Sequence, residues 1–299
     1  MLSFQNTPIE TYSIGKKPIL VKREDLCLAP DLGAPPFAKI RGLYEYIKTK
    51  KEEGILYFGY VDTSISMAGW GISFICKSLG VVAVLYYPAY KYGEYRKNQS
   101  EYIPKWHSFE AIIIPLKTPT QRQINIHRAK NEFFDKYPKN SHFLPDGLNV
   151  PQTINAVAKE VPSIQKYKIK TLVVCAGSGV MCAAILKGLF ANDIFVDTII
   201  AVPVNTSTDR LKLKKKILNL AGLTEHAGFI VPNLKSICKN FNIVDGGYVY
   251  EMPSTQQCPF PSNHYYDLKA WEWLTKNIKI CKAPVLFWNI GEGTDFMKI

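Results

Sequence analysis

The stretch VVCAGSGVMCAAILKGL, residues 173–189, decides the fold. It joins an apolar run to Gly177-Ser178-Gly179 and then resumes as apolar residues at helical spacing, which is the pattern of a buried strand, a tight turn and a helix. Backbone N–H groups and the positive end of a helix dipole meet at such a turn, and Ser178 adds a hydroxyl donor. The turn lacks the lysine of a Walker A loop. It therefore predicts either an anion site or tight packing between strand and helix.

The same alternation of strand and helix runs outward from this stretch. Strands are predicted over residues 55–60, 81–87, 111–115, 171–176, 196–202 and 285–288. Helices are predicted over residues 40–53, 66–79, 120–137, 151–160, 180–191, 208–220 and 264–277. This order indicates βα units and open, mostly parallel sheets, in which ligands bind beyond the carboxyl ends of the strands.

The composition limits the class of protein. A chain of 299 residues, 47% of them hydrophobic, buries a sizeable core, and no apolar run approaches the roughly 20 residues of a membrane helix. We therefore expect a cytoplasmic protein with no membrane partner. Seven cysteines without CxxC pairs predict reduced thiols and neither disulfides nor a metal site. The formal net charge of +12 favours an anionic substrate, an anionic cofactor or nucleic acid, and the basic run 210–216 is expected to be a solvated helix face.

Two further segments carry groups that chemistry can use. Thr63, Ser64 and Ser66 follow a predicted strand and precede a helix, so they offer hydroxyls for a carboxylate or an aromatic oxygen. Lys39 follows Phe37 and Ala38 directly before a helix. Partial desolvation there lowers the pKa of a lysine enough for a Schiff base, although a lone lysine beside an arginine is usually a surface residue.

In this order the segments resemble a known family of enzymes that use pyridoxal 5'-phosphate (PLP). It is the tryptophan-synthase β-like family of fold type II, and the resemblance is to its aminocyclopropane-carboxylate deaminase and D-cysteine desulfhydrase branch. The motifs that carry it span nearly the whole chain: ILVKREDL (19–26), PPFAKIRGLYEYI (35–47), DTSISMAGWGISFICKSLG (62–80), CAGSGVMCAA (175–184), HYYDLKAWEWL (264–274) and VLFWNIGEG (285–293).

The resemblance implies an α/β fold of two domains with open, mostly parallel sheets, the smaller domain inserted in the larger. Residues 1–48 and 143–299 would form the large PLP-binding domain, and residues 49–142 the small one. A homodimer is also implied. The resemblance further implies an enzyme that forms a Schiff base with an amino-acid-like substrate and breaks a bond at Cα.

The resemblance also assigns roles to residues of this chain. Lys39, Tyr266 and Asp267 would be catalytic: the lysine holds the cofactor, the tyrosine faces the substrate and the acid faces the pyridine nitrogen. The cofactor-binding residues would be Lys39, Ser66, Gly177, Ser178, Gly179, Val180, Met181 and Asp267. The substrate-binding residues would be Thr63, Ser64, Ser66 and Tyr266.

The chain departs from its branch in places that matter for specificity. Phe37 and Ala38 replace two glycines before the lysine, and the usual QSN substrate loop is absent, so neither deaminase nor desulfhydrase specificity carries over. The main hypothesis is a PLP-dependent lyase, a deaminase or a decarboxylase, of a free amino acid. An alternative is conversion of an aminoacyl-modified thymine in DNA, as in similar phage enzymes, with DNA contacted through a basic surface. A third is a non-catalytic anion-binding or nucleic-acid-binding protein on this fold.

Overall fold

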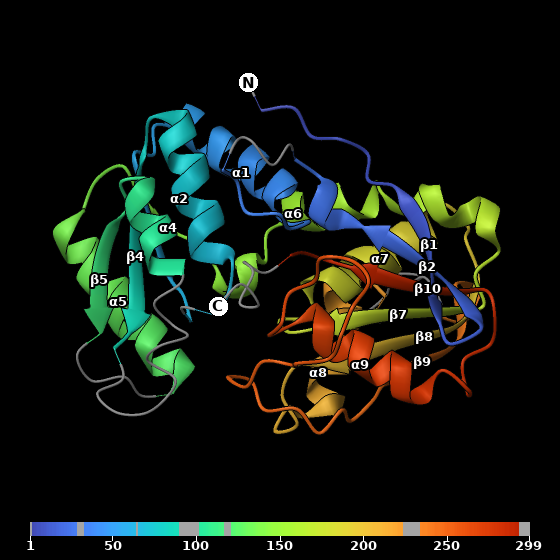
Figure 1. The fold of residues 1–299 in the computed structure, drawn as a ribbon. Coiled ribbons are helices and arrows are strands. Elements are labelled where there is room, and N and C mark those ends of the chain that lie inside the picture. Colours follow the sequence, from blue (N-terminus) through green and yellow to red (C-terminus); the bar gives the residue numbers. More distant parts are fainter. Residues whose placement is uncertain are drawn as a thin grey trace. The chain divides into compact units, whose positions relative to one another are not determined.

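The computed structural model describes residues 2–28, 33–63, 65–89, 102–116, 121–223 and 234–292. The chain divides into two compact units (Figure 1). Unit 1 comprises Met1–Pro30, Pro36–Arg41 and Thr153–Ile299, and unit 2 comprises Asp31–Pro35 and Gly42–Gln152. The predicted domain boundary after residue 48 falls within helix α1 (Ile40–Glu52), and the boundary after residue 142 falls within strand β6 (Ser141–Phe143).

Unit 1 is built on a six-stranded sheet in the order β1-β2-β10-β7-β8-β9. Its strands are β1 (Ile9–Ile14), β2 (Lys17–Arg23), β7 (Thr171–Ala176), β8 (Val196–Pro203), β9 (Cys238–Ile243) and β10 (Val285–Asn289). Neighbours are parallel except β1 and β2, which are antiparallel. Strand β7 is buried at every position, as a parallel strand covered on both faces must be.

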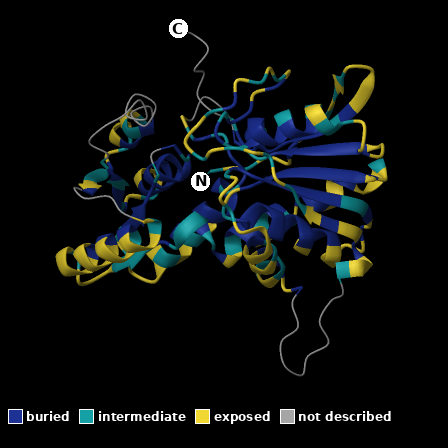
Figure 2. Cartoon of the chain, turned by 90° about the horizontal axis from the view of Figure 1, so that it is seen from below, coloured by how far each residue is buried: buried dark blue, intermediate teal, exposed yellow. Residues whose placement is uncertain are grey.

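Successive residues of a strand point to opposite sides of the sheet, so both faces present apolar side chains and both are covered by helices. Leu172 and Val174 pack against helices α7 (Val180–Ala191) and α8 (Arg210–Ala221). Val173 packs on the other face with helix α9 (Asp267–Asn277). Figure 2 shows the central strands as buried, with exposed positions on the outer sides of helices and in loops. Helix α6 (Pro151–Ala158) precedes β7 in the chain.

Unit 2 has a four-stranded parallel sheet in the order β5-β4-β3-β6. Its other strands are β3 (Tyr57–Val61), β4 (Val82–Pro88) and β5 (Ile112–Leu116), and its helices are α1, α2 (Ala68–Leu79), α4 (Tyr102–Ser108) and α5 (Arg122–Lys136). The predicted α/β class with two mostly parallel sheets is confirmed.

Each predicted strand and helix is present, with ends moved by a few residues at most. Strands β1, β2, β6 and β9 and helix α4 were not among the predicted elements. The edge strands β1 and β9 mix polar and apolar residues, so they carry no continuous apolar signal. Helix α4 has only seven residues and contains a proline, which hides its periodicity.

Candidate functional site

Lys39 lies at the carboxyl end of β10, where a short segment before α1 pairs with the residues that follow the strand. The Ala38 N–H donates to the Ile290 carbonyl at 2.9 Å, and Phe37 forms an antiparallel bridge with Gly291. The Lys39 side chain is half-buried, and its Nζ lies 3.4 Å from the Ser178 hydroxyl. The structure therefore brings Lys39 to the turn that follows β7, the neighbour of β10.

In the turn Gly177-Ser178-Gly179, the last glycine leaves no room for a side chain. Gly179 has φ +86°, and a Cβ there would lie 2.8 Å from Cγ1 of Ile217. A Cβ on Gly177 would lie 3.4 Å from the ring of Tyr266. The side chains of Val180 and Met181 are buried in the core, so these two residues can offer an anion only their backbone N–H groups.

We expect Gly179→Ala to lower both the stability and the cofactor affinity of the protein. The change adds left-handed strain and a clash with α8, whereas Gly222→Ala, at φ +72° with nothing within 4 Å, adds strain alone. Strain at such a position costs about 1–3 kcal/mol. Urea unfolding and PLP titration of both variants check this, and equal losses in the two would contradict a role for close packing at the turn.

Asp267, the first residue of α9, is fully buried and faces the segment that holds Lys39. Its Oδ1 accepts a hydrogen bond from the Ile290 N–H at 3.1 Å. Burial raises its pKa to about 8, and the charge of Asp25 acts in the same direction. No lysine or arginine of the described residues forms an ion pair with it. At neutral pH the carboxyl therefore holds its proton and can donate it to a basic atom.

Tyr266 is paired with a tyrosine that sequence reasoning missed. Its hydroxyl lies 2.6 Å from that of Tyr250, which belongs to the irregular stretch 246–263. The buried Lys269 holds this stretch by donating to the carbonyls of Val249 and Tyr250, and burial lowers the lysine pKa to about 8. Nothing in the sequence around Tyr250 singles it out as a partner of Tyr266.

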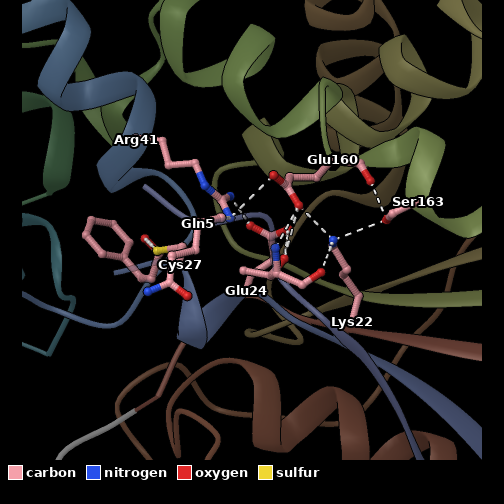
Figure 3. Close-up of polar contacts among 9 residues, drawn as sticks. Gln5, Lys22, Glu24, Cys27, Arg41, Glu160 and Ser163 are labelled. Atoms are coloured by element: carbon pink, nitrogen blue, oxygen red, sulfur yellow. Dashed lines mark hydrogen bonds and ion pairs between the residues drawn. The ribbon is translucent and has the colours of Figure 1, made fainter. Parts of the chain in front are cut away.

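A buried charge network holds the first turn of α1 through Arg41, two residues beyond Lys39 (Figure 3). Arg41 pairs with Glu24 and lies 3.6 Å from Oε1 of Glu160. The Nζ of Lys22 lies 2.7 Å from Oε2 of Glu160 and donates at 2.7 Å to the Thr7 carbonyl. Burial alone would raise the pKa of Glu160, but Lys22 and Arg41 together lower it. Burial raises the pKa of Glu24, whereas the neighbouring cations keep Glu160 ionised. The network joins β2, α1 and the segment after α6.

The predicted binding segment with Thr63 and Ser66 belongs to unit 2. It also contains Asp62, an acid that the sequence did not single out. The buried Asp62 carboxylate accepts hydrogen bonds from the Ser66 hydroxyl and the Gly69 N–H, and at 2.7 Å from the Thr63 N–H. The start of α2 is thus already occupied by a carboxyl group of the protein itself, whose pKa is raised by burial. The Ser66 hydroxyl, which was predicted to contact cofactor and substrate, donates to Asp62 in its own turn. Ser64 lies outside the described residues.

The described ranges also bear on metal ligation, membrane insertion and thiol chemistry. There, no group of three His, Cys, Asp or Glu side chains gathers as metal ligands. None of the helices in those ranges is both long and apolar enough to cross a membrane. All seven cysteines are free, and burial raises the pKa of the Cys182 thiol, near the turn after β7, to about 12.

Nearly the full length of the chain matches a phage enzyme. The glycyl-dTMP PLP-dependent decarboxylase of Pseudomonas phage M6 is 34% identical over 296 residues, which are 96% of this chain and 99% of that protein. The chain belongs to this family of PLP-dependent enzymes. No protein-family model matches it.

Solved structures place this PLP enzyme in fold type II, as predicted. An ACC deaminase homologue superposes with a TM-score of 0.72 at 18% identity, covering 96% of this chain and 89% of the other. The holo diaminopropionate ammonia lyase of Escherichia coli gives 0.62 at 16% identity, covering 99% and 86%. These likenesses concern the fold alone.

The residues of unit 1 fit the cofactor of the family. A half-buried lysine amine lies beside a turn with backbone N–H groups at a helix start, which suit the aldehyde and the phosphate of PLP. The buried carboxyl of Asp267 holds a proton and has no cationic partner among the described side chains, which suits a pyridine nitrogen. All of these groups lie at the edge formed by the carboxyl ends of β7 and β10.

Proposed function

We propose that this PLP enzyme decarboxylates an aminoacyl-modified thymidine nucleotide of the glycyl-dTMP type. The observation that carries the proposal is the 34% identity, over nearly the full length of both chains, to the phage enzyme named for that reaction. It favours the DNA-modification alternative over a lyase of free amino acids. The absence of the usual substrate loop and the net charge of +12 support the same choice.

Each site residue has a proposed role. Lys39 Nζ would hold the cofactor aldehyde, and the backbone N–H groups at the start of α7 would hold its phosphate. Asp267 would keep the ring nitrogen protonated through the proton that its buried carboxyl holds. Tyr266, fixed by its hydrogen bond to Tyr250, would orient the substrate beside Gly177.

Bound PLP supplies an aldehyde that condenses with an amine and a pyridinium ring that accepts the electron pair released at Cα. The bond between Cα and the carboxylate breaks, carbon dioxide leaves, and a proton takes its place at Cα. Lys39 Nζ is the group of this chain that we expect to deliver that proton.

The test is incubation of the holoenzyme with three kinds of substrate: glycyl-dTMP, an oligonucleotide that contains it, and free amino acids. Release of carbon dioxide and the matching mass loss from a modified thymidine support the proposal. Ammonia from free amino acids, with no change in either thymidine substrate, would instead establish the lyase hypothesis.

Replacement of Asp267 by Asn should change how stability depends on pH. Because burial raises the pKa of Asp267, the stability that this acid contributes is full below its unfolded pKa of 3.8 and is lost as pH rises through about 8. Asparagine does not ionise, so the variant should gain stability relative to the wild type between about pH 5 and pH 9. Thermal unfolding of the cofactor-free proteins measures this.

Asp245→Asn is the matched control for this experiment. The Gly247 N–H lowers the pKa of Asp245 below its ordinary value, so its ionisation is complete throughout that range and its effect on stability should be constant. A constant difference for Asp267→Asn as well would contradict the buried, protonated acid. The Asp267→Asn holoenzyme should also lose at least about tenfold in turnover.

A further inference from the structure

Helix α8 presents a cluster of cations to solvent. The helix, RLKLKKKILNLA, carries five basic residues and no acidic one. Leu213 and Ile217 face the core, whereas Lys212, Lys215 and Lys216 are exposed. Residues three and four apart are neighbours on a helix, so the ammonium groups at 212, 215 and 216 lie close together.

No internal partner neutralises this cluster within the part of the chain that the structure describes. Lys212, Lys215 and Lys216 take part in none of the ion pairs found there. Lys214 is different, because its Nζ donates to the Phe241 carbonyl at 2.9 Å and lies over that ring. Neighbouring like charges weaken a helix, and a bound polyanion removes that repulsion.

The position of α8 connects the cluster to the cofactor site. The loop between β8 and α8 starts beside the glycine turn, where the Val204 N–H donates to the Ala176 carbonyl at 3.4 Å. A Cβ built on Gly179 would meet Leu213 and Ile217 of α8 at 3.3 Å and 2.8 Å. Helix α8 therefore packs directly behind the turn, and its first turn, with the exposed Arg210, lies at the same sheet edge.

We propose that Arg210, Lys212, Lys215 and Lys216, the basic face of α8, bind the phosphate backbone of the DNA strand that carries the substrate nucleotide. This rests on the proposed function and adds the surface that recognises a polymeric substrate. The single phosphate of a mononucleotide does not depend on Lys212, Lys215 and Lys216, whereas a strand offers a phosphate to each cation. Leu211, 76% exposed among them, supplies an apolar contact for a sugar.

The test compares two triple variants with equal loss of charge. One is Lys212→Gln, Lys215→Gln, Lys216→Gln. The control is Lys166→Gln, Lys279→Gln, Lys282→Gln, whose lysines are exposed in segments that precede β7 and β10 and so lie at the opposite, amino edge of the sheet. Binding of unmodified duplex and single-stranded DNA to the holoenzymes is measured by fluorescence anisotropy over a salt series. Turnover is measured with glycyl-dTMP and with an oligonucleotide containing it.

The α8 variant should bind DNA at least about tenfold more weakly, with a salt slope lower by about 2 to 3, since each phosphate contact contributes about 0.9. It should lose turnover of the oligonucleotide but keep turnover of glycyl-dTMP, while the control behaves like the wild type. Equal losses in both variants, or unchanged binding in the α8 variant, would overturn the proposal. If the wild type binds DNA through α8 but decarboxylates neither substrate, the proposed function is wrong, whereas the assignment of α8 as a DNA-binding surface is still supported.

Discussion

Lys39→Ala should give a colourless protein that releases no carbon dioxide from glycyl-dTMP. Lys39 Nζ is the amine that the structure brings within 3.4 Å of the Ser178 hydroxyl, at the turn proposed to hold the cofactor phosphate. Its loss removes both the covalent attachment of PLP and the proposed proton donor, so turnover should fall by at least about 10³-fold. Absorbance before and after borohydride, together with carbon dioxide release, measures the effect.

Lys48→Ala is the matched control for this variant because Lys48 lies on α1, the helix that follows Lys39. It should keep the absorbance, its sensitivity to borohydride and the turnover. If the Lys39→Ala protein were folded by circular dichroism and still gave borohydride-sensitive absorbance, another lysine would hold the cofactor.

The second large effect concerns stability. Lys22→Met should lower the free energy of unfolding by about 3–5 kcal/mol, because it leaves the buried carboxylate of Glu160 with only the more distant Arg41 as a cationic partner. The lysine side chain is fully buried, so solvent does not replace the lost ion pair. Urea unfolding of the cofactor-free protein measures the change.

Lys276→Met provides the comparison, because it breaks an exposed pair with Glu272 in which the lysine side chain is 65% exposed. Such a pair contributes about 0–1 kcal/mol. A loss of similar size in both variants would mean that the buried network does not stabilise unit 1. The network also anchors the start of α1 through Arg41, so we expect Lys22→Met to weaken PLP binding more than Lys276→Met does.

The strongly patterned parts of the fold were predictable from the sequence. Strand β7 and helix α7 begin and end at the predicted residues because a continuous apolar run, a glycine turn and a helical period mark their limits. The neighbouring edge strand β9 was missed, since alternate exposure in a short polar segment looks like a loop.

Within the site, sequence order indicated Lys39, Gly177–Gly179 and Asp267, and the structure gathers them at one sheet edge. The sequence could not show which residues contact one another around the site. Lys22 and Glu160 are 138 positions apart, and only the folded chain shows that they form a buried ion pair. Asp62 was hidden for a different reason, because an acid beside serine and threonine looks like an ordinary helix cap.

The peptide unit of Ile290 has a wider consequence. Its carbonyl accepts from the Ala38 N–H and its own N–H donates to the Asp267 carboxyl, so one peptide unit sets the spacing between the amine-bearing segment and the acid. Side chains around these contacts can change without altering that spacing. The Ile290 peptide unit thus acts as a spacer between the groups proposed to contact the aldehyde and the ring nitrogen of the cofactor.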